Sequence, residues 1–149
     1  MDAVITDERV YRLSLHKYES ACEEHTHNLA ALLINKGFNE GVVVLHADLG
    51  TGKTVFVQGL ANALQCREHT VSPTFMYCRE YHGDVPLFHI DGYRIDEIKD
   101  TDTDFWKELL DNPGVIAVEW GERMETLIPK TALHLFGAIE PDGKRVLRC

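Results

Sequence analysis

The residues best placed to do chemistry form one short glycine-rich segment, Ala47-Asp48-Leu49-Gly50-Thr51-Gly52-Lys53-Thr54. It fits the phosphate-loop pattern G-x-x-x-x-G-K-[ST], except that Ala47 replaces the first glycine. Gly50 and Gly52 permit backbone angles that turn successive N–H groups toward phosphate oxygens, and Lys53 adds a positive charge for the outer phosphates. The Thr54 hydroxyl can bind Mg²⁺. The segment therefore predicts a site for a nucleoside triphosphate with Mg²⁺.

The elements on either side of this segment are those that a phosphate loop requires. Residues 41–46 are a β-branched run without alternation, which is typical of a strand buried on both faces of a parallel sheet. Phe56, Leu60 and Leu64 then repeat at helical spacing. A helix that starts near Gly52 would aim the positive end of its dipole at a bound anion. The alternative is a chance glycine-rich turn that carries a solvated lysine.

Two carboxylates follow other predicted strands. Glu119 ends a predicted strand at 115–118, and Asp91 ends one at 86–90. Because ligands bind at the carboxyl ends of parallel strands, either side chain could hold or order the metal, although each could also be a solvated loop carboxylate. Arg94 is either a phosphate contact or a partner in a surface ion pair.

The remaining pattern alternates strands with helices. Apolar positions repeat at three and four between Glu19 and Lys36, where they include His25, Leu29, Leu32 and Leu33, and this spacing predicts an amphipathic helix that stops at Gly37. Further elements are predicted at 10–15 (strand), 74–81 with 85–90 (hairpin), 105–110 (short helix) and 132–139 with 145–148 (terminal hairpin). We therefore expect an α/β fold with a mixed sheet whose core is mostly parallel, flanked by helices and followed by late antiparallel hairpins.

Composition limits the classes of protein to which the chain can belong. A length of 149 residues indicates one domain, 1–149. The formal net charge of −9 disfavours strong direct binding to nucleic acid, and no apolar run reaches the roughly 20 residues that cross a bilayer. The acidic start is unlike an export signal, and four scattered cysteines are no disulfide framework. We therefore expect a cytoplasmic protein without membrane contact.

Four blocks of residues, in order, resemble the TsaE (YjeE) family of small bacterial P-loop ATPases. The blocks are Asp48 to Thr54, Ser72-Pro73-Thr74-Phe75, Phe88 to Arg94, and Glu119-Trp120-Gly121-Glu122-Arg123 with Ile128-Pro129 after it. That family serves the biosynthesis of threonylcarbamoyladenosine in tRNA. The resemblance implies a P-loop fold and hydrolysis of ATP with Mg²⁺, in concert with the partner proteins TsaD and TsaB.

The resemblance also implies roles for individual residues. Lys53 and Thr54 would hold the nucleotide and Mg²⁺, and Glu119 would be a second metal ligand. Lys53, Asp91 and Thr74 would be the catalytic residues. Trp120 would lie near the nucleotide, and the nucleotide would also contact Gly50, Thr51, Gly52, Lys53, Thr54 and Val55.

Two residues depart from the family pattern. Ala47 stands where glycine is usual, which would cost of order 1 kcal/mol if the position needs a positive φ. Val55 stands where a second threonine is common, so that only its backbone N–H can serve the nucleotide. We expect weaker nucleotide affinity at most.

Other functions remain open on the sequence. A small-molecule kinase could use the same loop with Asp91 as its base, although a chain this short leaves little room for an acceptor pocket and a lid. A binding module could dock partners in its ATP-bound state, with turnover incidental. A structural domain without nucleotide would require the loop match to be accidental.

Overall fold

The computed structural model describes residues 18–20, 22–47, 53–71, 77–143 and 145–148. In chain order these residues form β1 (Tyr18–Ser20), α1 (Glu23–Asn35), β2 (Gly41–Ala47), α2 (Lys53–Ala63), β3 (Glu68–Val71), β4 (Cys78–His82), β5 (Leu87–Asp91), η1 (Gly92–Arg94), α3 (Asp100–Asp111), β6 (Val115–Glu119), η2 (Gly121–Leu127), β7 (Leu133–Ile139) and β8 (Arg145–Arg148), where η denotes a 3₁₀ helix.

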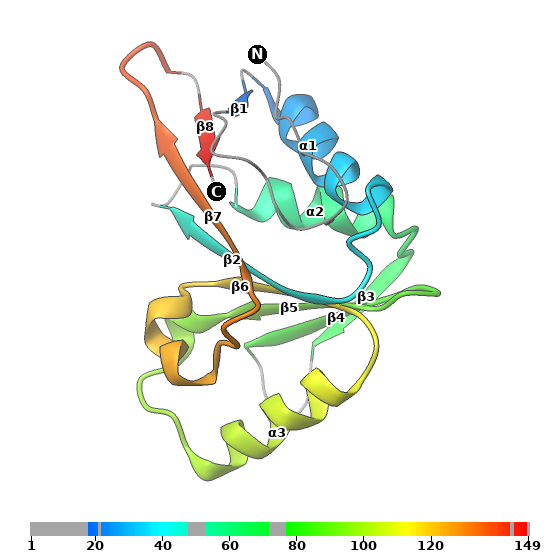
Figure 1. Ribbon diagram of the computed structural model, residues 1–149, viewed down its shortest axis with the longest axis vertical. Helices are drawn as coiled ribbons and strands as arrows, with labels where there is room; N and C mark the ends of the chain where they lie inside the picture. The colour runs from blue at the N-terminus through cyan, green and yellow to red at the C-terminus, as the bar shows by residue number, and fades with distance from the viewer. Residues whose placement is uncertain (1–17, 21, 48–52, 72–76, 144, 149) are drawn as a thin grey trace.

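Over the described ranges the strands form one sheet in the order β1-β8-β7-β2-β6-β5-β4-β3 (Figure 1). The four central strands, β7, β2, β6 and β5, run parallel, whereas β1, β8, β4 and β3 pair antiparallel on either side. This confirms the expected α/β fold, with a parallel core and the late hairpin of β7 and β8. It also places the phosphate-loop strand β2 in the middle of the parallel region, as predicted.

Helices cover both faces of the sheet, with α1 and α2 on one face and α3 on the other (Figure 1). Alternate residues of β2 supply the two cores because side chains along a strand point to opposite faces. Val43 and Leu45 pack with the residues of α1 and α2, whereas Val42 and Val44 pack with those of α3 and η2. The predicted burial of this strand on both faces is confirmed.

The helices α1 and α2 pack closely on each other at Gly59. A Cβ atom added there would come within 2.9 Å of Ala30 Cβ and of His27 Cα, so that only glycine fits without a shift. Because α2 begins at Lys53, this packing also fixes the helix that follows the phosphate loop.

The first predicted helix is present as α1, but its predicted start at Glu19 is wrong. Glu19 belongs to β1, which pairs with β8, and the helix begins only at Glu23. Strand pairing with the distant end of the chain overrides the local helical periodicity. The buried face also differs, because His25 is exposed and Leu32 half-buried, whereas the buried residues are Thr26, Leu29, Ala30 and Leu33.

The predicted short helix at 105–110 is part of a longer one. α3 begins at Asp100, because the buried Asp102 side chain accepts the Lys99 N–H at 2.8 Å and the Tyr77 hydroxyl at the start of the helix. The apolar periodicity that predicted the helix covers only its second half. The edge strand β3 was not predicted, since its four residues show no clear alternation.

The predicted strand at 10–15 lies outside the described residues. Within the described ranges, no helix is long and apolar enough to cross a bilayer.

Candidate functional site

The ends of three central strands bring the candidate residues together at the carboxyl edge of the sheet. In the parallel register Glu119 lies beside Asp91 on one side and beside Leu45 on the other. Glu119 is two residues after Ala117, and Asp91 is four after Leu87, so that both stand on the face that packs against α1 and α2. The first residue of α2, Lys53, starts on that same face.

Ala47, the departure from the phosphate-loop pattern, is accommodated without strain. It is the last residue of β2 and pairs with Gly137 of β7, so its backbone is extended. The cost that a positive φ would bring therefore does not arise at this position.

Glu119 is a buried carboxylate whose bonding is incomplete. The residue is 8% exposed, and its Oε1 atom lies 3.2 Å from Nε2 of the buried His89. Despite that distance, neither atom makes a hydrogen bond within the described part of the chain. A buried carboxylate oxygen that accepts no hydrogen bond is costly, and a bound cation would satisfy it.

Lys53 is also buried, at 9% exposure, and its ammonium lies against an aromatic ring. Its Nζ atom is 4.4 Å from the centroid of the Trp120 ring, well within the range of a cation–π interaction. Trp120 itself adopts a left-handed conformation, with φ 56° and ψ 43°. This conformation costs a non-glycine residue about 1 kcal/mol or more and is often found at functional sites.

Asp91 shapes the turn that leaves β5. Its Oδ1 atom accepts the Tyr93 N–H at 3.1 Å, which caps η1, and its own N–H donates to the Tyr77 carbonyl at 2.8 Å. The side chain is half-buried, so that its second oxygen can still serve a ligand. Its role in the turn is established by these contacts, whereas its catalytic role stays a prediction.

Gly92 allows η1 to approach the end of β6. An added Cβ would lie 2.5 Å from the Trp120 carbonyl oxygen and 2.9 Å from that of Glu119. Both neighbours are backbone atoms, which cannot move aside cheaply. The absence of a side chain at Gly92 therefore allows the two strand ends that carry the candidate carboxylates to lie close together.

The structure thus brings together Lys53, Glu119, Asp91 and Trp120 from four separate places in the sequence. Thr54 follows Lys53 with an exposed side chain, and Val55 is half-buried. Several predicted residues lie outside the described residues, and their predictions stay untested: Gly50, Thr51, Gly52 and Thr74. The same applies to the side chain of Arg94.

Three neighbours of the site were not singled out from the sequence. His89 reaches Glu119, the Tyr93 ring lies 5.2 Å from the Trp120 ring, and Arg123 lies 5.4 Å from the Tyr93 ring. The alternation of β5 could have indicated His89, because it places this side chain on the same face as Asp91. No local signal pairs Tyr93 with Trp120, since the contact joins two strand ends.

A second histidine cluster lies on the opposite face of β2. His46 Nε2 is 2.7 Å from His134 Nδ1, and the His46 ring stacks on Phe136 at 4.6 Å. Burial lowers the pKa of His46, the nearby His134 lowers it further, and Glu122 opposes the shift. His46 is thus held toward its neutral form directly before the last residue of β2.

The donor set of the carboxyl edge fits a magnesium ion. Mg²⁺ prefers oxygen ligands and is commonly bound through one or two protein oxygens together with substrate phosphates. The unpartnered Glu119 Oε1 is such an oxygen, and the Thr54 hydroxyl is exposed at the start of α2. Among the residues that the structure describes, these two could hold the ion, and Asp91 lies beside Glu119.

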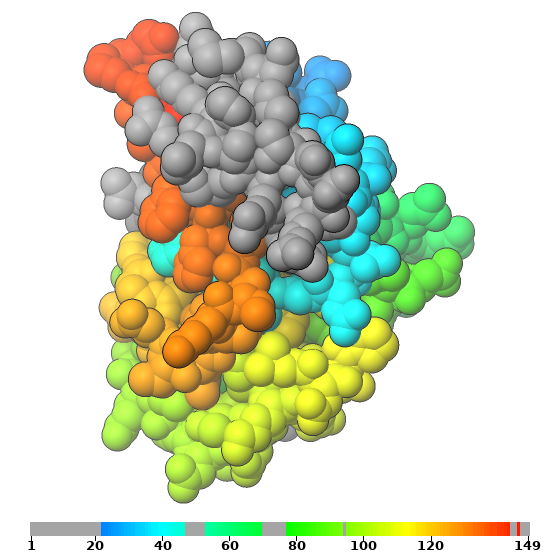
Figure 2. Space-filling view, in the orientation of Figure 1, coloured from blue at the N-terminus to red at the C-terminus, as the bar shows by residue number. Residues whose placement is uncertain are grey.

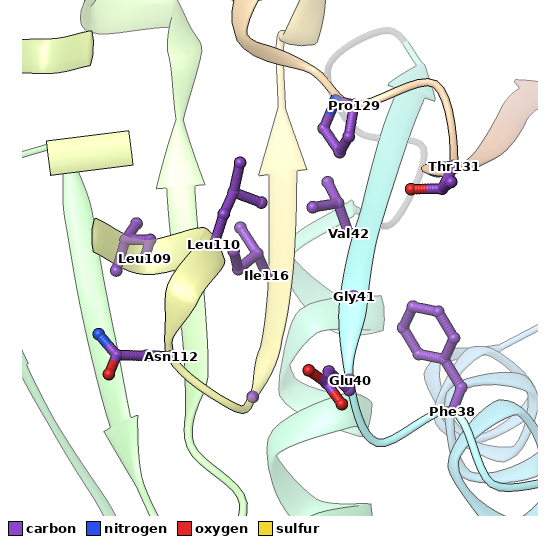
Figure 3. Close-up of a pocket in the computed structure, with 11 residues that line it drawn as sticks. Phe38, Glu40, Gly41, Val42, Leu109, Leu110, Asn112, Ile116, Pro129 and Thr131 are labelled. Carbon is purple, nitrogen blue, oxygen red and sulfur yellow. The ribbon is translucent and has the colours of Figure 1, made fainter. Parts of the chain in front are cut away.

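A pocket of about 360 Å³, lined by apolar side chains together with Glu40, Asn112 and Thr131, lies at the opposite, amino edge of the sheet (Figure 3). Leu110 and Ile116 face Val42 and Pro129 across it. On the surface, the end of α3 (yellow), the segment before β7 (orange) and the segment entering β2 (cyan) come together (Figure 2). Because the strands of the parallel core point away from this edge, the pocket is separate from the carboxylate cluster.

Comparisons with known proteins identify the family of the chain. Residues 20–146 match the family model described as "Threonylcarbamoyl adenosine biosynthesis protein TsaE". The chain is 38% identical over 129 residues to the tRNA threonylcarbamoyladenosine biosynthesis protein TsaE of Nostoc sp., covering 84% of this chain and 79% of that protein. It is 36% identical over 121 residues to the protein of the same name from Bacillus subtilis, covering 80% and 75%.

A solved structure shares the fold. The crystal structure of Bacillus subtilis YdiB superposes with a TM-score of 0.68 at 28% sequence identity, covering 89% of this chain and 82% of that one. The family match spans all of the elements described above except β1 and the end of β8, and it includes every candidate site residue. The chain therefore belongs to the TsaE family of tRNA threonylcarbamoyladenosine biosynthesis proteins.

Proposed function

We propose that this protein binds and hydrolyses ATP with Mg²⁺ and thereby assists tRNA threonylcarbamoyladenosine modification in the cytoplasm. One observation carries the proposal: a buried lysine and a buried carboxylate with an unpartnered oxygen converge at the strand end that enters the phosphate-loop sequence. A buried carboxylate oxygen that accepts no hydrogen bond is costly unless a ligand compensates it. A magnesium ion bound with a triphosphate would supply that ligand, and the phosphates would attract the Lys53 ammonium.

Each residue then has a role that follows from its chemistry. The loop amides of residues 50–54 would bind the outer phosphates, and Lys53 would neutralise negative charge on them. Thr54 and Glu119 would hold the Mg²⁺, whose charge would offset that of the phosphates. Hydrolysis adds the oxygen of water to the γ-phosphorus and releases ADP, and catalysis consists of positioning and charge neutralisation.

Asp91 and Thr74 complete the active site in this proposal. Asp91 lies beside Glu119 in the register and keeps one carboxylate oxygen outside its turn hydrogen bond. It can therefore orient a water molecule next to the phosphates. Thr74 follows from the family resemblance alone.

We assign the remaining part of the site to partner proteins of the TsaD and TsaB type. No arginine finger can be identified in the sequence, and a phosphate-loop protein without one hydrolyses its nucleotide slowly. A partner that supplies a positive charge next to the transferred phosphate would raise the rate of hydrolysis by several orders of magnitude. The acidic net charge of −9 fits contact with these proteins rather than with the tRNA itself.

The experiment that tests the proposal is a binding titration of ATP and of GTP, each with and without Mg²⁺. We expect preference for ATP, tighter binding with Mg²⁺, and loss of binding in Lys53→Ala. Lys107→Ala, which changes an exposed lysine of α3, is the matched control and should bind as the wild type does. Equal affinities of wild type and Lys53→Ala would refute the proposal.

Hydrolysis is tested separately with the partner proteins present. We expect the wild type to release phosphate faster than Lys53→Ala when TsaD and TsaB are added, and no phosphorylated product other than ADP and phosphate. Accumulation of a phosphorylated small molecule would favour the kinase alternative. A variant that binds ATP without hydrolysing it, yet supports full tRNA modification, would favour the binding-module alternative.

A further inference from the structure

Four side chains form a continuous stack from the buried lysine to the surface. Lys53 Nζ lies 4.4 Å from the Trp120 ring centroid, the Trp120 and Tyr93 rings are 5.2 Å apart and tilted by 52°, and the Arg123 guanidinium lies 5.4 Å from the Tyr93 ring. The stack therefore has a cation at each end and two aromatic rings between them. Lys53 is 9% exposed, whereas Tyr93 is 56% exposed.

The backbone holds the stack from both sides. Trp120 is fixed in a left-handed conformation between β6 and η2, and Gly92 brings η1 against the Trp120 carbonyl. Arg123 is held by its own contacts, because its Nη1 donates to the Ile95 carbonyl at 3.4 Å and lies 4.0 Å from Asp96. The backbone at Trp120 and the side chain of Arg123 are thus held by contacts that do not involve Lys53.

The Lys53 ammonium is the member of the stack that a bound phosphate would attract. A ring face attracts an ammonium much more weakly than a phosphate does, since the ring carries a quadrupole and the phosphate a full charge. A triphosphate bound at the loop would therefore draw the ammonium away from the ring. The ring would then lose a cation from one face while it kept Tyr93 beside it.

We propose that Trp120 is a positioning residue that holds the Lys53 ammonium before nucleotide binds, and that transfer of the ammonium to phosphate changes the Trp120–Tyr93–Arg123 surface. The proposal rests on the proposed function and adds a route by which the occupied site is sensed at the surface. A partner protein that contacts Tyr93 would thereby distinguish the nucleotide-bound chain from the empty one.

The test is ¹⁹F NMR of the full chain labelled with 5-fluorotryptophan. The chain has two tryptophans, and Trp106, a buried residue of α3, gives an internal control resonance. Trp120→Phe identifies the Trp120 resonance. Without any nucleotide, Lys53→Met should shift the Trp120 resonance and leave that of Trp106 in place.

The second step adds magnesium tripolyphosphate, which has no aromatic base to disturb the rings. In the wild type we expect the Trp120 resonance to move to the position seen in Lys53→Met, and in Lys53→Met we expect no movement. With 3-fluorotyrosine labelling, the Tyr93 resonance, identified by Tyr93→Phe, should move in the wild type alone.

The outcomes separate this proposal from the proposed function. If tripolyphosphate and ATP fail to bind the wild type in a titration, the proposed function fails and this proposal fails with it. If they bind but the Trp120 resonance stays in place, or if Lys53→Met does not shift it, only the positioning role is overturned. If the Trp120 resonance moves while the Tyr93 resonance stays in place, the proposed change of the Trp120–Tyr93–Arg123 surface is overturned.

Discussion

The two edges of the parallel core differ in how completely their buried groups are satisfied. At the carboxyl edge, the buried Glu119 and His89 each leave a polar atom without a hydrogen bond, and Lys53 lies against a ring. At the amino edge, a pocket is lined by apolar side chains such as Val42 and Ile116, with polar groups only on part of its wall.

This difference indicates that the pocket at the amino edge is not the site where we expect chemistry. Apolar walls can bind by burying surface, but they cannot neutralise a charge or polarise a bond. Buried polar groups without partners cost stability, and they persist at positions where a ligand or reaction uses them. We therefore expect ligand chemistry at the carboxyl edge rather than in the pocket of the amino edge. Four predictions test this contrast, from the largest expected effect to the smallest.

Glu119→Gln should have the largest effect. It keeps the shape of the side chain but removes the charge that could hold a metal, and we expect ATP turnover with Mg²⁺ to fall about 100-fold or more. The free energy of unfolding should hold or rise, because an uncompensated buried charge is lost. Phosphate release and urea denaturation measure the two effects. Glu125→Gln, an exposed change in η2, should alter neither, and an unchanged turnover in Glu119→Gln would contradict the assignment.

Leu109→Ala tests the amino edge. Leu109 is 4% exposed and packs in the core beneath α3, so that its truncation should cost about 2–3 kcal/mol in the free energy of unfolding. Nucleotide affinity of the folded variant should match that of the wild type, as measured by calorimetric titration. Leu110→Ala, its 40% exposed neighbour, should cost much less. A loss of affinity in folded Leu109→Ala would show that the edges are coupled.

Gly92→Ala and Gly114→Ala compare the same change at the two edges. Each added methyl would meet backbone, 2.5 Å from the Trp120 carbonyl oxygen at Gly92 and 2.7 Å from that of Pro86 at Gly114. We expect each to cost about 1–3 kcal/mol in unfolding free energy. Only Gly92→Ala should also weaken nucleotide binding, because the shift displaces Trp120. Equal affinities of the two folded variants would argue against a site at the end of β6.

The smallest effect concerns pH. Burial lowers the pKa of His46, and His134 lowers it further, so that the folded protein takes up a proton less readily than the unfolded chain does. Stability should therefore be full above the unfolded pKa of about 6.5 and decline as the pH falls through it. Urea midpoints between pH 7.5 and 5.5 should fall less steeply in His46→Gln than in the wild type. An identical decline in both would exclude this contribution, and His25→Gln, which keeps His46, is the control.

Much of the candidate site was predicted from the sequence because the signals are local. Glycines, lysine and threonine at fixed spacing indicate a phosphate loop, and carboxylates directly after β-branched runs indicate strand ends. The structure confirms that Glu119 and Asp91 lie together at the end of the parallel strands. The contacts of His89 with Glu119 and of Tyr93 with Trp120 were not predicted, because each joins residues about 30 apart across neighbouring strands.

The errors in the fold have the same origin. The helix predicted from Glu19 begins at Glu23 because Tyr18–Ser20 pairs with β8, more than 120 residues away in sequence. α3 extends back to Asp100 because Asp102 bonds to Tyr77 and to Lys99, which no periodicity could indicate. In both cases a long-range contact overrode the local pattern.

The kind of fold and the family could be predicted from the residues alone, since both depend on local periodicity and on short motifs in a fixed order. The folded structure was needed to show that Glu119 and Lys53 are buried, that Glu119 Oε1 accepts no hydrogen bond within the described residues, and that Lys53 lies against Trp120. The physical reason is that burial and pairing depend on strand order and register. These are set by contacts between distant segments and cannot be obtained from the spacing of neighbouring residues.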